Sequence, residues 1–403
     1  MEFEEVELGQ ISNVTKLAGY EFTNNIKYTN DGDIIAIRAL NIKNGKLDLS
    51  QVKKITKETS NNLLRSKLYK NDIVLTYTGS KYGEVALINQ NEKFHLAPNV
   101  CKVTVASNVN PYYIFLIMQT RSFKIQMKNF GVGSSQPTIP MKNIRKLKIL
   151  LPSLEHQNKI VKLLKPLDEK IDLNYKLVTN LEELSQTIFK HWFINFEFPN
   201  QRNSSYNYNR KETSKDLPHG WKWEKLNHLF KINYGKNLPT KNLLDTGYPV
   251  YGGNGKIGYY SNYMYDDPKI LISCRGAASG AIHVSQEHSF ITNNSIVLDE
   301  IEKEYFYYFK ELFSRETFKR YTTGSAQPQI TIVNIKELKF LVPPKSLVIE
   351  FNKHQKPIFD FNSKLKQENS KLKSLRDTLL PKLMSGEIEI PDDIEVNMDE
   401  FSI

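Results

Sequence analysis

The chain has 403 residues, and at ~150 residues per domain this length predicts two or three domains. It carries 55 Lys and Arg against 44 Asp and Glu, and the net charge of +11 predicts a polyanionic partner, most simply nucleic acid. Two cysteines are too few for a disulfide framework or a structural zinc site, and the chain shows neither a signal peptide nor an apolar run long enough to span a membrane. We therefore expect a reduced, cytoplasmic protein.

The first 150 residues contain short apolar runs that predict the strands of a mixed α/β domain. These runs lie at 34–37, 73–77, 85–88 and 102–105. The loop TYTGSKYGEV follows the second run, and its glycines allow the backbone to approach a ligand closely. A second polar loop begins at Gly133, and for both loops a tight turn is the alternative interpretation. Their candidate DNA contacts are Thr78, Ser80, Lys81, Tyr82, Ser134, Ser135 and Gln136.

A long helix with a regular apolar face is predicted after this domain. Apolar residues recur there in alternating steps of four and three, which is the pattern of a coiled-coil seam. We expect Pro166 to open the helix, because proline is tolerated in a first turn but breaks a helix interior. From there the helix has ~25 residues and a length of ~38 Å. Its expected pairing positions are Ile160, Leu164, Leu167, Ile171, Asn174, Val178, Leu181, Ser185 and Ile188.

The end of this helix leads through a polar segment into a second domain. Trp192 and Phe193 are candidates for binding a partner protein or for capping the local core. The segment PNQRNSSYNYNRKETSKD has no apolar period and predicts a flexible linker. Apolar runs at 270–273, 281–284 and 295–298 then predict strands again. The candidate DNA contacts of this domain are Asn254, Lys256, Tyr259, Arg275, Ser279, Ser325 and Gln327, and arginine is the residue that most often reads guanine.

An internal repeat relates the two halves. Residues 133–153 read GSSQPTIPMKNIRKLKILLPS, residues 324–344 read GSAQPQITIVNIKELKFLVPP, and eleven of the 21 positions are identical. Gln136 and Gln327 are 191 positions apart. The segments DIVLTYTGSKYGEVALI and KILISCRGAASGAIHVS also align, but the side chains between their glycines differ. A duplicated scaffold with divergent loops is expected when two copies read different targets.

A second helix follows the second repeat. Pro357 lies 191 positions after Pro166 and is expected to open it. Two such helices in one chain most simply pair antiparallel, giving a pseudo-two-fold object. Asn174 and Glu368 interrupt the two seams and are either solvated or buried residues that fix the register. The acidic tail after Gly386 is expected to be peripheral. The pairing positions on this helix are Phe351, His354, Ile358, Phe361, Leu365, Glu368, Leu372, Leu375 and Leu379.

Motifs of catalytic sites are missing from the sequence. The run GGNGK at 252–256 is followed by Ile257 and has the wrong spacing for a phosphate-binding P-loop. There is no [Asn/Asp]-Pro-Pro-[Tyr/Phe] segment of an amino-methyltransferase, no His-Glu-x-x-His and no Cys-x-x-Cys. His283 and His288 favour structural roles over a metal site. We therefore predict a non-catalytic binding protein that holds no metal or cofactor itself.

The pattern as a whole resembles the specificity (S) subunits of type I restriction–modification systems. Two dissimilar domains are each followed by a repeated helix, as in that family. The family's junction between domain and helix resembles GSSQPTIPMKNIRKLKILLPSLEHQNKIV, and the end of its central helix resembles FKHWFINFEFP. An early segment of its recognition domains resembles PVYGGNGKIGYYSNY, and the end of its C-terminal helix resembles LRDTLLPKLMSGEI. The second junction, PPKSLVIEFNKHQ, departs from the usual pattern.

The resemblance implies an α+β fold with two target-recognition domains and two long antiparallel coiled-coil helices. It implies that the chain reads a bipartite, asymmetric DNA site. Two methyltransferase (M) subunits would dock on it and transfer methyl from S-adenosylmethionine to adenine N6. Restriction (R) subunits, where present, would add cleavage driven by ATP and Mg²⁺. The paired helices would act as a ruler, since half-sites repeat at ~34–36 Å.

The expected boundaries follow from these features, and two other interpretations remain open. One is a coiled-coil protein–protein scaffold, whose DNA affinity would not fall steeply with salt. The other is a fragment of a fused enzyme, against which the missing motifs argue. The expected parts are recognition domains at 1–152 and 216–344, helical regions at 153–195 and 345–385, a linker at 196–215 and a tail at 386–403.

Overall fold

The computed structural model describes residues 3–133, 137–197, 220–324 and 327–391, which belong to two compact units. Unit 1 comprises Met1–Ile171 and Ser370–Ile403, and unit 2 comprises Asp172–Asn369. Each unit holds one α/β domain together with a part of each long helix, α7 (Leu154–Phe189) and α11 (Lys345–Met384). The predicted fold class, two α/β domains with two long helices, is confirmed.

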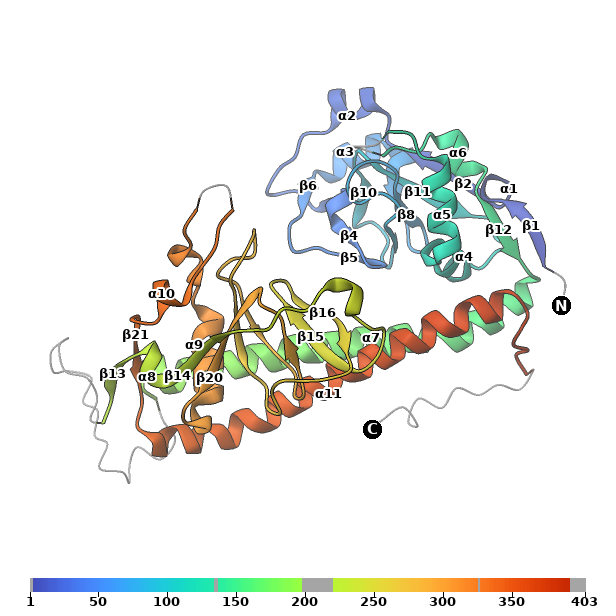
Figure 1. Cartoon of the computed structure of the whole chain (residues 1–403). Helices are drawn as coiled ribbons and strands as arrows, with labels where there is room; N and C mark the ends of the chain where they lie inside the picture. The colour runs from blue at the N-terminus through green and yellow to red at the C-terminus, as the bar shows by residue number, and fades with distance from the viewer. Residues whose placement is uncertain (1–2, 134–136, 198–219, 325–326, 392–403) are drawn as a thin grey trace. The chain divides into compact units, whose positions relative to one another are not determined.

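The domain of unit 1 is built around β8 (Figure 1). Its residues Ile73–Thr76 are all buried. Ile73 and Leu75 enter one core cluster and Val74 enters another, because successive side chains of a strand point to opposite faces. A strand covered on both faces reads as a continuous apolar run, which is why the sequence revealed it. One sheet has the order β2-β11-β8-β9, a second has the order β6-β3-β10-β7, and β1 pairs with β12.

The strands of unit 1 are β1 (Glu4–Glu7), β2 (Ser12–Lys16), β3 (Ile34–Ile37), β4 (Ile42–Lys43), β5 (Lys46–Leu47), β6 (Lys53–Ile55), β7 (Lys67–Leu68), β8 (Ile73–Thr76), β9 (Val85–Leu87), β10 (Phe94–Leu96), β11 (Val100–Val105) and β12 (Lys148–Leu151). Its helices before α7 are α1 (Leu8–Ile11), α2 (Gly19–Asn25), α3 (Lys57–Asn62), α4 (Pro111–Gln119), α5 (Arg121–Phe130) and α6 (Met141–Arg145).

Unit 2 repeats this plan. The sheet β14-β20-β17-β18 corresponds to β2-β11-β8-β9, and β13 pairs with β21 as β1 pairs with β12. A further sheet has the order β16-β15-β19. The correspondence extends to buried side chains, since the hydroxyl of Tyr113 donates to the Leu150 carbonyl and that of Tyr308 to the Leu341 carbonyl. The duplication predicted from sequence is therefore present in the structure.

The strands of unit 2 are β13 (Lys222–Lys225), β14 (Phe230–Tyr234), β15 (Tyr248–Gly252), β16 (Gly255–Tyr260), β17 (Ile270–Ser273), β18 (Ile282–Val284), β19 (Phe290–Ile291), β20 (Ser295–Glu300) and β21 (Lys339–Val342). Its short helices are α8 (Leu226–Leu229), α9 (Phe306–Arg315) and α10 (Ile332–Ile335).

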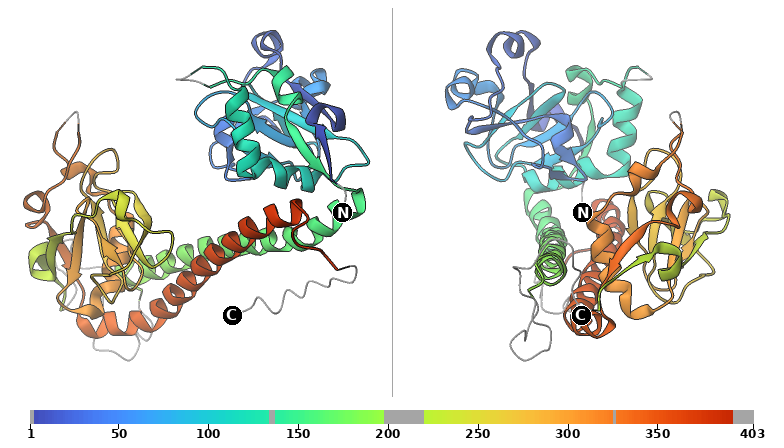
Figure 2. Two further views of the ribbon diagram at one scale, coloured as in Figure 1. Left: turned by 45° about the vertical axis from the view of Figure 1, so that its right-hand side comes forward. Right: turned by 90° about the vertical axis from the view of Figure 1, so that its left-hand side faces the viewer.

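Within each unit, α7 and α11 lie side by side and run antiparallel (Figures 1 and 2). In unit 2, Asn174 hydrogen-bonds to Asn369, Glu182 to Asn362 and Ser185 to Gln355, so rising numbers on one helix meet falling numbers on the other. In unit 1 the two helices share the domain core. The residues there are Leu164, Leu167 and Ile171 of α7 with Leu372, Leu380 and Leu383 of α11.

The predicted helix starts are wrong, because Pro166 and Pro357 lie inside α7 and α11. An interior proline costs roughly 3 kcal/mol. Ile160 before the first proline and Phe351 before the second are fully buried, and this burial offsets the cost. The helices have 36 and 40 residues, hence lengths of about 54 Å and 60 Å rather than ~38 Å.

Most of the expected seam positions on α7 are buried, whereas the buried face of α11 is shifted from the expected one. Asn174 is fully buried, and of the other expected α7 positions only Leu181 and Ile188 are half-buried. On α11, Phe351, Leu365 and Leu372 are buried, Ile358, Glu368 and Leu379 are half-buried, and His354, Phe361 and Leu375 are exposed. The buried neighbours are Gln355, Asn362 and Asn369. Hydrophobicity alone could not select these amides, because their burial depends on partners across the helix pair.

The structure also decides three smaller points. Trp192 and Phe193 pack into the unit 2 core beside Phe189 and Phe351, so they cap the local core rather than stand free for a partner. The tail is not peripheral throughout, since Ile390 is buried in the core of unit 1. Phe196 lies in the expected linker at 196–215 but packs against Trp221.

Candidate nucleic-acid interface

The loop that follows β8 in unit 1 is fixed to the hairpin before α6 by main-chain hydrogen bonds. The Gly79 N–H donates to the Pro137 carbonyl at 3.1 Å, and Thr78 forms an isolated bridge with Thr138. The Thr138 hydroxyl donates to the Thr78 hydroxyl at 3.1 Å. Gly79 has φ +93°, a conformation that favours glycine, and a Cβ placed on it would meet nothing within 4 Å. The loop therefore presents open backbone beside the hairpin.

Unit 2 contains the same arrangement after β17. The Gly276 N–H donates to the Pro328 carbonyl at 3.0 Å, and Arg275 forms an isolated bridge with Gln329. Gly276 has φ +75° and open space at its Cβ position. Two polar segments that are more than fifty residues apart in sequence thus meet in each unit.

The side chains on these matched loops differ in number of donors and in exposure. Ser80 and Arg275 are exposed, Thr78 and Lys81 are half-buried, and the described residues provide no ion-pair partner for either cation. A free guanidinium at a loop edge can donate two parallel hydrogen bonds to guanine. Gln327 is exposed as well, whereas Ser134, Ser135, Gln136 and Ser325 lie outside the described residues.

Two of the candidate contacts point inward. The Tyr82 hydroxyl donates to the Met127 carbonyl, and burial raises the pKa of this phenol. Ser279 is buried, with 3 % of its surface exposed. Tyr82 thus ties the loop to the domain, and neither side chain enters the interface that we propose below.

A second hairpin of unit 2 joins the Arg275 loop. Its turn connects β15 to β16, and the Ser273 hydroxyl donates to the Gly253 carbonyl. A Cβ on Gly253 would lie 3.8 Å from the Arg275 carbonyl oxygen, so the two backbones are adjacent. Asn254 at the turn is exposed. Lys256 is also exposed, with its Nζ 4.0 Å from the ring centroid of the half-buried Tyr259.

Sequence reasoning missed Lys16. This residue ends β2, is exposed, and its Nζ lies 5.4 Å from the ring centroid of Tyr77 at the start of the glycine loop. No glycine or repeat marks it in the sequence. The signal that could have found it is the pairing of β2 with β11, which sets Lys16 opposite Cys101.

The described residues hold no group of three or more His, Cys, Asp or Glu side chains that could bind a metal ion. Among the same residues, no helix is long and apolar enough to cross a membrane.

The family model for the type I restriction modification DNA specificity domain matches residues 1–183 and 218–378. The chain belongs to the type I restriction–modification specificity subunits. Two matched segments, one for each half, agree with the duplication of domain and helix described above. The family resemblance noted in the sequence is confirmed.

Curated relatives extend over most of the chain. The MjaIX specificity subunit of Methanocaldococcus jannaschii is 24 % identical and covers 70 % of this chain and 69 % of its own length. The HindI specificity subunit of Haemophilus influenzae is 22 % identical over 96 % of this chain and 100 % of its own. The crystal structure of the S subunit from M. genitalium superposes with a TM-score of 0.60 at 18 % identity, covering 98 % of this chain and 97 % of that one, and it supports the fold.

Proposed function

We propose that this specificity subunit reads two different segments of duplex DNA, one with each domain, and contributes no catalysis of its own. The observation that supports this most strongly is the loop–hairpin pairing built twice with different side chains. Main-chain bonds hold the two loops alike, while Thr78 in one copy corresponds to Arg275 in the other. A shared frame with different donors suits an asymmetric, two-part site.

The proposed contacts in unit 1 are Thr78, Ser80, Lys81 and Lys16, and in unit 2 Asn254, Lys256, Arg275 and Gln327. The net charge of +11 supplies attraction to the DNA backbone irrespective of sequence. In this proposal M subunits dock along the helices, take S-adenosylmethionine, and methylate adenine N6 after the base has left the stack. R subunits, where they accompany the complex, use ATP and Mg²⁺ for restriction.

The helix pair is proposed to set the distance between the two half-sites. One heptad adds ~10 Å to a helix at 1.5 Å per residue. Inserting one heptad into both α7 and α11 should lengthen the unread spacer by ~3 base pairs, given ~3.4 Å per base pair. Long-read sequencing of the methylated motif measures this spacer, and an unchanged spacer would refute the ruler.

The function as a whole is tested by mapping N6-methyladenine in a host that carries this gene and its M gene, against a host with the M gene alone. We expect a new two-part motif that depends on this chain. An active, bound M subunit without a new motif would instead favour the protein–protein scaffold.

Arg275 offers a sharper test of the interface. Arg275→Ala should weaken binding to the cognate duplex by ~1–3 kcal/mol and relax selection at one base pair. Lys303→Ala is the matched control, because it also removes one exposed positive charge. Its partner Asp267 precedes β17, whereas Arg275 follows that strand at the other end. Equal losses for both variants in a titration at fixed salt would contradict a base contact by Arg275.

A further inference from the structure

The contact between α7 and α11 contains polar side chains that bind one another across the helix pair. In unit 1, Asp168 accepts from the Arg376 guanidinium at 2.7 Å and from the Tyr112 hydroxyl at 2.8 Å. The Asp168 and Arg376 side chains expose 18 % and 21 % of their surface. Both are largely withdrawn from water, and Asp168 is the partner of Arg376 across the helix pair, while Asp377 accepts from Arg376 within α11.

In unit 2 the polar contacts are more numerous. Asn174 is fully buried, and its amide N–H groups donate to Glu368 at 2.7 Å and to Asn369 at 3.0 Å. Glu182 accepts from Lys366 at 2.8 Å and from Asn362 at 3.5 Å.

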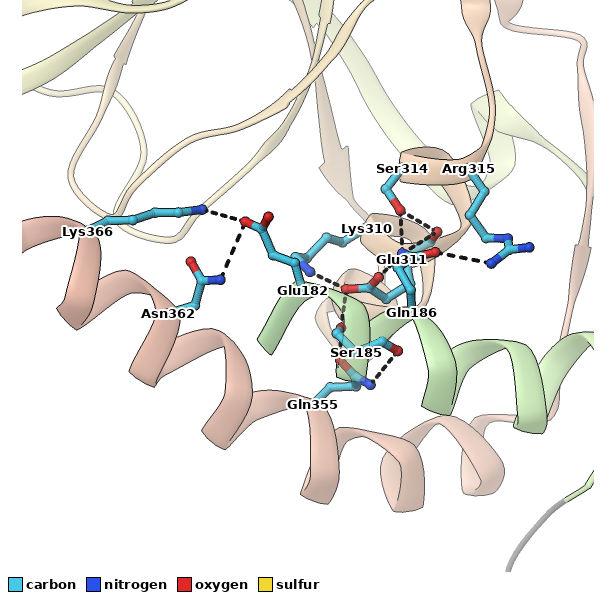
Figure 3. A network of polar contacts seen from close by, with 10 residues as sticks. All are labelled: Glu182, Ser185, Gln186, Lys310, Glu311, Ser314, Arg315, Gln355, Asn362 and Lys366. Carbon is cyan, nitrogen blue, oxygen red and sulfur yellow. Dashed lines mark hydrogen bonds and ion pairs between the residues drawn. The ribbon is translucent and has the colours of Figure 1, made fainter. Parts of the chain in front are cut away.

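Figure 3 shows how this helix contact continues into the domain of unit 2. The Ser185 hydroxyl lies 2.5 Å from carboxylate Oε1 of Glu311 on α9 and 2.5 Å from side-chain Oε1 of Gln355. Glu311 is itself buried and also pairs with Lys310. The network therefore ties both long helices to the same domain.

The two helices are copies of one ancestral segment, and the repeat spacing of 191 residues relates their faces. The buried α7 positions 164, 171, 174 and 178 correspond to 355, 362, 365 and 369, which are also buried on α11. A second copy of α7 could therefore occupy the place of α11 with the same backbone geometry. What differs is the chemistry at each position.

In such a self-pairing of the first half, the polar residues of α7 would lose the side chains that they now contact on α11. Asp168 would meet Ser185 in place of Arg376. Asn174 would meet Val178 in place of Asn369, and Glu182 would meet Ile171 in place of Asn362. Of these residues Asn174 is fully buried, and leaving it without a partner is strongly unfavourable, whereas an apolar pair at the same place would not be.

Polar mismatches oppose self-pairing of the second half less completely than self-pairing of the first half. Arg376 would face Phe359, Asn369 would face Leu365, and Lys366 would face Lys373. Arg376 would, however, also come to Glu311 and Gln355 of the other copy, where Ser185 now lies. The bias against self-pairing is thus carried chiefly by the first half.

We propose that these polar residues act as a recognition code between the halves: the helix of the first half accepts the helix of the second half and rejects a second copy of itself. This goes beyond DNA reading and does not depend on it. Its consequence is that each first half pairs with a second half and not with another first half.

The code is tested in the full chain by replacing a residue of α11 with the residue at the corresponding position of α7. Asn369→Val presents to Asn174 the side chain that a second first half would present. We expect the unfolding midpoint to fall by several degrees, and we expect Asn174→Val in the same chain to restore it, since both buried amides are then removed. If Asn369→Val alone matches or exceeds the wild-type midpoint, the amides carry no code and the proposal fails.

Partner choice is measured after cutting the full chain at a protease site inserted within residues 199–216. The fragments are unfolded in urea, diluted together, and weighed by native mass spectrometry. We expect the pair of unlike fragments and no pair of first fragments. A first-fragment pair at or above its statistical share would overturn the proposal.

A gain-of-function variant keeps this second test decisive. Val178→Asn with Ser185→Arg gives the first fragment the α11 side chains that Asn174 and Asp168 require. We expect this fragment to pair with itself, which the wild-type fragment does not. The matched control, Thr179→Asn with Thr187→Arg, adds the same groups at exposed positions of α7 and should not create the pair. If both variants form a first-fragment pair, or if neither does, the code is refuted. If the fragments do not refold, the unfolding midpoints of the Asn369→Val series decide whether the proposal holds.

Discussion

The two α/β domains share their backbone and differ in the chemistry placed on it. The strand that leads to the glycine loop is preceded by Asp72 in unit 1, which accepts from the Thr104 hydroxyl. In unit 2 it is preceded by Lys269, which pairs with Asp299 at 2.8 Å. The charge is reversed while the position and the contact between strands are kept. The loops that follow behave alike, with identical main-chain bonds under different side chains. Backbone bonds and glycine conformations thus hold the frame, and the side chains are left free to diverge.

The largest expected effect separates two equivalent glycines. Gly83 and Gly280 have φ +82° and +86°, but a Cβ on Gly280 would lie 2.4 Å from the Lys319 nitrogen, whereas one on Gly83 meets nothing within 4 Å. Gly280→Ala should lower the free energy of unfolding by about 3 kcal/mol or more, because the added Cβ meets backbone as well as strain. Gly83→Ala should lower it by about 1 kcal/mol, from backbone strain alone. Urea unfolding of both variants measures the difference. Equal costs would show that the backbone of unit 2 yields at this point.

One pH-dependent effect is expected from a carboxyl group of unit 2 that has no counterpart in unit 1. Burial raises the pKa of Glu300 to about 7, and the corresponding residue of unit 1 is Val105. Because the folded chain holds this proton more tightly than the unfolded chain, the stabilisation is complete below pH ~4.5 and is lost as the pH rises to about 7, by up to about 3 kcal/mol. Glu300→Gln should flatten this part of the stability curve between pH 5 and 8. An unaltered slope in the variant would assign the dependence to other groups.

The paired tyrosines should respond equally. Tyr113 and Tyr308 each donate a buried hydroxyl hydrogen bond to a carbonyl just before a long helix. Tyr113→Phe and Tyr308→Phe should each lower the free energy of unfolding by about 1 kcal/mol. Thermal unfolding of the two variants checks this. A much larger loss for one of them would show that the domain–helix junctions are not equivalent.

The smallest effect on stability is expected from exchanging loop side chains. The changes Thr78→Arg, Ser80→Ala and Lys81→Ala give the unit 1 loop the side chains of Arg275, Ala277 and Ala278 while leaving Tyr82 in place. The free energy of unfolding should change by only about 0.5 kcal/mol, since these side chains are not in the core. One part of the methylated motif should change while the other is kept. An unchanged motif would exclude this loop from DNA reading.

The sequence alone was enough to predict the repeat, both long helices and the buried strands of both domains. Continuous apolar runs revealed β8 and β17, because strands covered on both faces need no polar alternation. The two glycine loops could also be predicted from the sequence, since a positive φ restricts the residue type and favours glycine. Short strands such as β6 and β10 were not found, because two or three residues carry too little periodicity to detect.

Only the tertiary structure decided which face of α11 is buried and where the helices begin. The choice of Phe361 and Leu375 followed hydrophobicity, whereas burial of Asn362 and Asn369 depends on partners on α7. Proline marked a helix start by local rules, yet burial of Ile160 and Phe351 outweighed its cost. Local sequence determines what a segment prefers, and the contacts between distant segments determine which of those preferences the folded chain keeps.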